Sequence, residues 1–211
     1  MGNISSTKTI EITKHTEERE FSCLFKKKSN FDYLFKFNTQ TNKMERIKLS
    51  KFAKVKKDVK IMDCGNGIYF MYEGTDNKGN VLNLCFLYNL LNKQMIELPP
   101  LPQAYYDSAC AYFQNKIIVI GGLLKYDTSN KTIIRDCYLL DLKKRKWFLI
   151  ADLPEKLLKM SCFIYNYSVH VIGIGEGQWR SYLIIYTYCE ENNKWLKKGE
   201  SFLNHFLRLH L

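Results

Sequence analysis

With 211 residues, of which 46% are hydrophobic and 14% aromatic, the chain is long and apolar enough to build one packed domain, which excludes an intrinsically disordered protein. No apolar run reaches the roughly 18 residues that a membrane-spanning helix needs, and the N-terminal segment lacks the apolar core of a secretory signal. The net charge of +11 favours acidic partners or anionic lipid. Nucleic acid is not expected as a partner, because the cations are mostly dispersed lysines. We therefore expect a cytoplasmic protein.

Residues 1–20 are predicted to be a flexible N-terminal segment. Their first residues, MGNISS, fit the N-myristoylation pattern, in which Gly2 becomes the N-terminus and Ser6 occupies the Ser/Thr position. A single myristoyl chain binds membranes only marginally, and the positive charge of the chain would supply a second signal. The alternative is chance, because any Met-Gly start with a serine or threonine four residues later fits. Gly2 is therefore a candidate lipidation site, and the protein a candidate peripheral membrane protein.

From residue 21 to residue 202 the chain is a series of short strand-like segments. Runs such as FDYLFKF, GIYFMY, KIIVI and YLIIYTY are rich in Ile, Val, Tyr and Phe and are separated by clusters of Asn, Gly, Asp and Lys. Turn signals recur about every ten residues, which favours an all-β architecture. Only 155–160 (EKLLKM) and the C-terminal FLNHFLRLHL have a helical pattern.

The strand-like segments repeat with a period near 50 residues. Bulky apolar residues that follow a polar turn stand at 44, 95, 147 and 195, which are 51, 52 and 48 residues apart. A Leu-Pro pair at 101–102 recurs at 153–154. A period near 50 with four strands in each unit is typical of a β-propeller blade.

Two pairs of cysteines obey the same period. Cys85 and Cys137 are 52 residues apart, as are Cys110 and Cys162. Cysteines that are equivalent in different repeats occupy equivalent places in different units. We therefore predict small core residues and not disulfide partners.

One stretch of the chain resembles a known family. The sequence KIIVIGG, then a loop, then CYLLDLKKRKW and LP is similar to the kelch repeat. The resemblance implies a glycine pair that ends the second strand of a blade, a tyrosine on the third strand and a tryptophan on the fourth strand that packs between blades. These structural positions fall on Gly121, Gly122, Tyr138 and Trp147, and in the next repeat on Gly173, Gly175, Tyr186 and Trp195.

The resemblance predicts an incomplete kelch-type β-propeller with about 3.5 four-stranded blades. Half a blade is expected at 21–49, whole blades at 50–102, 103–154 and 155–202, and a tail at 203–211. Methionine replaces tryptophan at 44 and 95, where we expect it to fill the same space. The chain is then a fragment, a degenerate copy, or a protein that closes its ring by self-association.

Two short motifs have alternative interpretations. The GxGxG in GIGEGQWR (173–180) would need a following helix to bind a nucleotide, and its glycines fall on the glycine position of the repeat. The KKRK at 143–146 fits a nuclear-import signal, but it also falls on the hairpin turn between the third and fourth strands, where lysines are solvated. No cofactor is expected.

Catalysis has little support in the sequence. The chain lacks a nucleophile elbow and a recurring His/Cys/Asp set. Some kelch-like propellers are copper-radical oxidases, which need paired histidines and tyrosines around one metal. The four histidines, His15, His170, His205 and His210, are scattered, so no metal and no enzymatic activity are expected, and an oxidase is a remote alternative.

The resemblance implies a protein-interaction module, a scaffold or adaptor that recognises another protein through loops at one rim. These loops are 73–80, 123–132 and 175–181, together with the blade links 99–107 and 152–159. Aromatic residues and arginine make the strongest contacts, and the candidate contact residues are Tyr105, Tyr106, Lys125, Tyr126, Asp127, Trp179 and Arg180. For the tyrosines, packing between blades is the alternative. The alternative function is a lipid-anchored basic adaptor at the cytoplasmic membrane surface.

Overall fold

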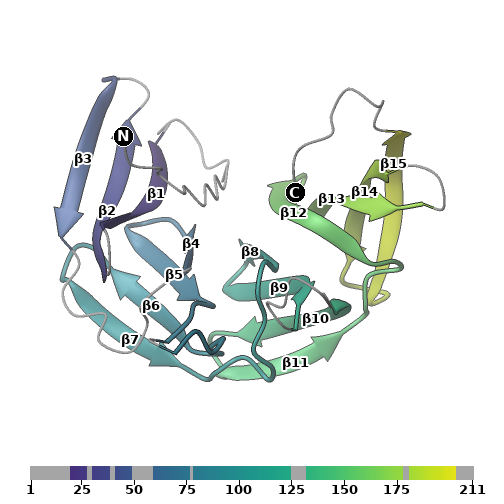
Figure 1. The fold of residues 1–211 in the computed structure, drawn as a ribbon, viewed down its shortest axis with the longest axis horizontal. Helices are drawn as coiled ribbons and strands as arrows, with labels where there is room; N and C mark the ends of the chain where they lie inside the picture. Colours follow the sequence, from purple (N-terminus) through teal and green to yellow (C-terminus); the bar gives the residue numbers. More distant parts are fainter. Residues whose placement is uncertain are drawn as a thin grey trace. The chain divides into compact units, whose positions relative to one another are not determined.

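The computed structural model describes residues 20–27, 30–38, 41–48, 59–76, 78–124, 132–177 and 181–202. These residues form fifteen β-strands and contain no helix (Figure 1). Accordingly, no helix that could cross a membrane is found in the described part of the chain. The chain divides into two compact units, Met1–Tyr105 and Tyr106–Leu211.

The first unit contains two antiparallel sheets, each built from strands that follow one another along the chain. The three-stranded sheet consists of β1 (Glu20–Lys27), β2 (Asn30–Asn38) and β3 (Lys43–Lys48). The four-stranded sheet consists of β4 (Lys60–Asp63), β5 (Ile68–Tyr72), β6 (Cys85–Asn89) and β7 (Gln94–Leu98). Alternating large apolar residues of the four-stranded sheet, Tyr69, Met71, Phe86 and Tyr88, together with Ile61, form its buried core.

The second unit contains two four-stranded antiparallel sheets. The first consists of β8 (Ala109–Phe113), β9 (Lys116–Leu123), β10 (Ile133–Asp141) and β11 (Lys146–Ile150). The second consists of β12 (Leu157–Tyr165), β13 (Ser168–Glu176), β14 (Ser181–Cys189) and β15 (Lys194–Phe202). The all-β prediction with four-stranded blades is thus confirmed.

One segment with a helical pattern is instead a strand. The prediction for 155–160 was wrong, because residues from Leu157 onward belong to β12 and pair with β13. A register shift between Leu158 and Ser161 keeps both Leu157 and Met160 buried, so pairing and burial override the local helical pattern. The other such segment, at the C-terminus, lies largely outside the described residues.

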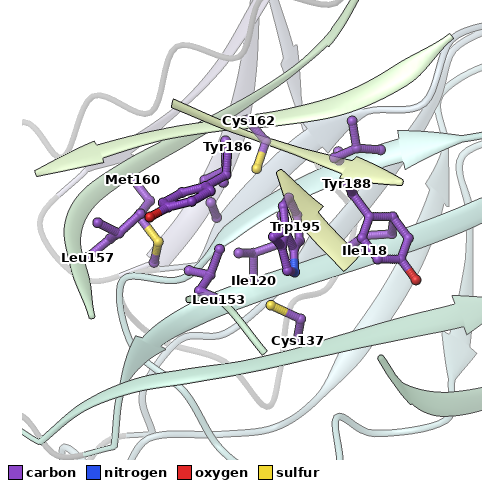
Figure 2. Packing of buried hydrophobic residues seen from close by; sticks show 14 of the residues in the cluster. Ile118, Ile120, Cys137, Leu153, Leu157, Met160, Cys162, Tyr186, Tyr188 and Trp195 are labelled. Atoms are coloured by element: carbon purple, nitrogen blue, oxygen red, sulfur yellow. The ribbon is translucent and has the colours of Figure 1, made fainter. Parts of the chain in front are cut away.

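A single hydrophobic cluster joins the two sheets of the second unit (Figure 2). Ile118, Ile120 and Cys137 come from the first sheet, while Tyr186 and Trp195 come from the second. The indole Nε1 of Trp195 donates a hydrogen bond to the Ala151 carbonyl at 2.8 Å, beyond the end of β11. Trp195 is only 7% exposed, so it packs between two blades as the repeat predicts, whereas Trp147 and Tyr138 are half-buried.

Methionine does not replace tryptophan as a packing residue. Met44 is 60% exposed and Met95 is 37% exposed, so the expectation that they fill the space between blades was wrong. Both lie on the last strand of their sheet, where exposed positions dominate. The thioether has no N–H to anchor it as the indole of Trp195 is anchored.

The four repeat-related cysteines are core residues, as predicted. Cys85, Cys110, Cys137 and Cys162 are all buried and carry free thiols. Burial raises the pKa of the Cys85 and Cys137 thiols to about 12. These thiols are therefore protonated at neutral pH and serve as small apolar residues.

The glycine pair of the second unit has the conformation that glycine favours. Gly121 has a φ of 54° and Gly122 a φ of 121°, and the β9–β10 register shifts beside them. A Cβ on Gly121 would lie 2.8 Å from the Met160 Cε, and one on Gly122 would lie 3.0 Å from the Tyr106 carbonyl oxygen. The pair lies within β9 and does not end it, because the strand continues to Leu123.

The first two glycines of the GxGxG motif, Gly173 and Gly175, are also packing residues. A Cβ on Gly173 would lie 3.0 Å from Leu157, and one on Gly175 would lie 2.5 Å from the Tyr182 ring. The next described element is β14, a strand. The expectation that these glycines belong to the repeat framework therefore agrees with their contacts.

Candidate interaction surface

The connections of the second unit lie at two ends of its sheets. Because each sheet is an antiparallel meander, successive connections alternate between the ends. We call the end with the β9–β10 and β13–β14 loops and the β11–β12 link the rim end. The opposite end, with the β8–β9, β10–β11, β12–β13 and β14–β15 hairpin turns, is the turn end.

Most predicted contact residues lie outside the described residues. These are Lys125, Tyr126 and Asp127 in the β9–β10 loop and Trp179 and Arg180 in the β13–β14 loop. Gly2 is also outside the described part of the chain. Their roles as contact or lipidation residues remain predictions.

Tyr106 lies at the base of the β9–β10 loop. Its backbone N–H donates to the Leu123 carbonyl at 2.9 Å, and the Leu123 N–H donates to the Tyr106 carbonyl at 2.6 Å. The loop is closed one residue later by the Leu124 N–H, which donates to the Thr132 carbonyl at 3.1 Å. Tyr106 is half-buried, and the structure therefore places it at the rim end, beside the loop that holds three other predicted contacts.

Tyr105 has no exposed surface. Its prediction as a contact residue does not agree with this position, because a buried ring cannot meet a partner without rearrangement. Packing, the alternative interpretation of this tyrosine, accounts for its burial.

A carboxylate that was not identified from the sequence organises the rim end. Glu155, in the β11–β12 link, accepts hydrogen bonds from the hydroxyl groups of Tyr182 and Tyr186 on β14. The hydrogen bond to Glu155 raises the pKa of Tyr182 to about 12, and burial followed by the same carboxylate raises the pKa of Tyr186. Both tyrosines thus remain neutral donors at physiological pH and fix the link to the second sheet.

The same link is tied to the first sheet. The Leu153 N–H donates to the Arg135 carbonyl at 2.9 Å, and the Arg135 Nη1 donates to the Pro154 carbonyl at 3.1 Å. Leu153 itself is buried. The blade link is therefore a pre-formed part of the rim end.

In the first unit, the loop after β5 is also ordered by a carboxylate. Asp76 Oδ1 accepts hydrogen bonds from the Lys78 and Asn80 backbone N–H groups at 2.8 and 2.9 Å, and Oδ2 accepts from the Asn80 side chain at 2.8 Å. These bonds lower the pKa of Asp76, with the Asn80 side chain as the largest cause. The aspartate builds an Asx-type turn that exposes 78–80.

The histidine in the described part of the chain, His170, is used in packing and hydrogen bonding. His170, the one with a described position, receives or donates a hydrogen bond with Thr187 Oγ1 at 2.7 Å, and its ring stacks on Phe163 at 5.0 Å. The residues with described positions contain no group of three or more His, Cys, Asp or Glu side chains that could hold a metal. His15, His205 and His210 lie outside them.

No family model matches the sequence, but individual relatives do. Kelch-like protein 13 of Mus musculus is 30% identical over 86 residues, which cover 41% of this chain and 12% of the relative. Kelch-like protein 13 of Homo sapiens gives the same values, and Kelch-like protein 9 of Mus musculus is 30% identical over 86 residues, 13% of its length. The matched region is thus a small part of these relatives.

A solved structure supports the fold. The structure of YjhT matches with a TM-score of 0.58 and 15% sequence identity, and the match covers 80% of this chain and 52% of that chain. At this identity the match concerns the fold alone. Together with the four-stranded sheets, it confirms the predicted fold, an incomplete kelch-type β-propeller, and the sequence matches show that part of the chain is similar to kelch-like proteins.

Proposed function

We propose that the protein is a non-catalytic interaction module, a kelch-type scaffold or adaptor that binds another protein through its rim-end loops. The observation that carries this proposal is a division of roles in the second unit. The glycines, cysteines and Trp195 of the repeat are used for packing, while the two longest connections, 124–132 and 151–156, both lie at the rim end. Loops on a rigid scaffold are the usual place of recognition.

The chemistry of the core supports a non-catalytic role. The Cys85 and Cys137 thiols, whose pKa is raised to about 12, are protonated at neutral pH and are poor nucleophiles. The Glu155 carboxylate is held by two tyrosine hydroxyls, which makes it a structural group of the blade link.

The rim-end proposal is tested by double alanine substitution of Trp179 and Arg180. We expect the variant to keep the far-UV spectrum and melting temperature of the wild type and to lose partners captured by cross-linking in the native cell. The matched control is Leu196→Ala/Lys198→Ala, which also removes one apolar and one cationic side chain, both from exposed positions of β15. Equal capture by both variants would contradict the proposal, and unfolding of the Trp179/Arg180 variant would assign these residues to the framework.

A second candidate function is a lipid-anchored basic adaptor at the cytoplasmic membrane surface. Its support is the β10–β11 turn, where Lys143, Lys144, Arg145 and Lys146 are all exposed. The Lys144 and Lys146 Nζ atoms lie 5.8 and 5.6 Å from the centre of the Phe148 ring, and cations beside an exposed aromatic ring suit an anionic lipid surface.

Two measurements test the membrane candidate. Labelling with a myristate analogue should mark the wild type and not Gly2→Ala. Sedimentation with phosphatidylserine vesicles should fall when salt is raised, because exposed charges are screened. A wild type that takes no label and does not sediment at low salt contradicts this candidate.

Self-association is a further part of the proposal. A partial propeller that closes with a second copy would have twice the mass of the chain in solution, and light scattering would measure this. A monomer at every concentration would rule it out.

A further inference from the structure

The turn end of the second unit contains a pocket that the rim-end function does not use. The pocket has a volume of about 440 Å³ and lies between the β8–β9, β12–β13 and β14–β15 connections. Its walls combine the aromatic residues Phe113, Tyr167 and Tyr188 with the charged residues Lys116, Glu190 and Glu191. Figure 2 shows Tyr188 and Ile118, a further wall residue, at one edge of the buried cluster.

Tyr167 is an unusual residue for its backbone position. It forms the two-residue β12–β13 turn with Asn166, and their φ angles are 56° and 45°. The equivalent β8–β9 turn, 52 residues earlier, uses Gln114 and Asn115, with φ of 49° and 60°. Asparagine suits this left-handed conformation, whereas a tyrosine there costs roughly 1 kcal/mol.

Burial of the Tyr167 side chain does not offset this conformational cost. Its side chain is 86% exposed and borders the pocket. A residue that breaks a local rule without a gain in packing marks a place where function, and not folding, selects the side chain.

The charges of the pocket favour a cation. Lys116 makes an ion pair with Glu190, so these two charges offset each other. Glu191 is exposed and adds a further negative charge to the wall. In a chain with a net charge of +11, this pocket is a local site of opposite sign.

The basic β10–β11 turn also belongs to the turn end. Its residues are not among those that form the wall. Lys144 lies 3.8 Å from Asp141, and the Lys144 and Lys146 ammonium groups lie over the Phe148 ring on β11. A negatively charged partner would therefore bind at the β10–β11 turn and not in the pocket.

We propose that this pocket binds an arginine or lysine side chain in a basic segment of a partner protein. The exposed Tyr167 ring supplies a face for the cation, Glu191 supplies the counter-charge, and Phe113 and Tyr188 pack against the methylene groups. The site is separate from the rim end, so a partner would contact both ends of the blades or two partners would bind together.

The experiment uses the full chain and a defined probe, the peptide acetyl-Gly-Arg-Arg-Gly-amide, followed by amide shifts in NMR. We expect saturable shifts at Tyr167, Ser168, Glu190 and Glu191. Tyr167→Asn should weaken binding of the peptide at least tenfold, which corresponds to about 1.4 kcal/mol. Because Asn115 occupies the equivalent turn, this variant should fold at least as well as the wild type, so lost binding is not lost folding.

The controls separate the site from general charge effects. Glu191→Gln should also weaken binding of the peptide. Glu45→Gln, which removes an exposed carboxylate from β3, should leave the affinity unchanged. A peptide with glutamines in place of the arginines should not bind. The Trp179/Arg180 double variant should bind the peptide as the wild type does, so failure of the rim-end proposal leaves this test intact.

Three outcomes would overturn the proposal. One is the absence of saturable shifts in the wild type, and another is equal affinity of Tyr167→Asn and the wild type. The third is salt-sensitive self-association that Tyr167→Asn abolishes, which would assign the pocket to a second copy of the chain.

Discussion

β5 in the first unit and β9 in the second occupy the same place in the repeat, but different residues stand at the turn that each strand reaches. After Tyr72 the first unit has Glu73 and Gly74, with φ of 59° and 106°; after Ile120 the second has Gly121 and Gly122, with φ of 54° and 121°. The backbone follows nearly the same path in both. These two repeats therefore share a backbone conformation, and glycine is the residue that adopts it with the least strain.

Glu73, which stands where the second unit has Gly121, buries a carboxylate in the first unit. The Glu73 side chain is only 1% exposed, and its carboxylate lies 3.8 Å from the Lys60 ammonium group. A buried carboxylate is tolerated when it is paired. The last strands of two repeats can be compared in the same way: Trp195 is buried, whereas Met95 is exposed. The first unit therefore has no packing contact at Met95 that corresponds to the one made by Trp195.

The largest expected effect tests that difference. Trp195→Ala should destabilise the second unit by about 3–5 kcal/mol, because it leaves a cavity between two sheets and removes the bond to Ala151. Met95→Ala should cost less than about 1 kcal/mol, because its side chain is exposed. Urea unfolding of both variants measures the two values, and equal costs would mean that the positions are equivalent in packing after all.

The glycine conformation gives the next effect. Gly122→Ala should cost about 2 kcal/mol, because the φ of 121° is strained for alanine and its Cβ would press on the Tyr106 carbonyl. The control is Gly199→Ala on β15, whose Cβ would meet nothing within 4 Å. Thermal unfolding should show a drop for the first variant alone, and a stable Gly122→Ala would show that this conformation is not required.

The Glu73–Lys60 pair should give a smaller loss. Glu73→Gln should lower the free energy of unfolding by about 1 kcal/mol, because the Lys60 charge, on a side chain only 11% exposed, loses a counter-charge. Adding Lys60→Met should recover part of this loss. If the double variant loses more free energy of unfolding than the two single variants together, the loss of the Glu73–Lys60 pair does not explain the effect of Glu73→Gln.

The smallest effect concerns high pH. The folded-state pKa of Tyr182 is raised from 10 to about 12 by Glu155, so folding favours the protonated hydroxyl. Its contribution to stability is therefore present below pH 10 and is lost as the pH rises through about 12. Tyr182→Phe should flatten the fall of the melting temperature between these values, and ultraviolet titration should show one late-titrating tyrosine fewer. An unchanged titration would contradict the role of Glu155.

Much of the architecture could be predicted from spacing. The period of Met95, Trp147 and Trp195 predicts repeated blades, and the 52-residue spacing of the cysteines predicts that they are core residues. The strand identity of 157–160 could not be predicted, because its local pattern is helical and only pairing with β13 makes it a strand. Tyr105, predicted as a contact, is buried, because the sequence of the link between β7 and β8 does not reveal which of its side chains neighbouring elements cover.

The sequence by itself determined the strand pattern, the repeat and the places where the backbone needs glycine, because these depend on local periodicity and local conformation. The tertiary structure alone decided which of two equivalent residues is buried, as with Trp195 and Met95, and which distant groups meet. Glu155 is 27 residues from Tyr182, and Lys116 is 74 residues from Glu190. Such contacts arise from the packing of one sheet on another, and no local pattern in the chain records them.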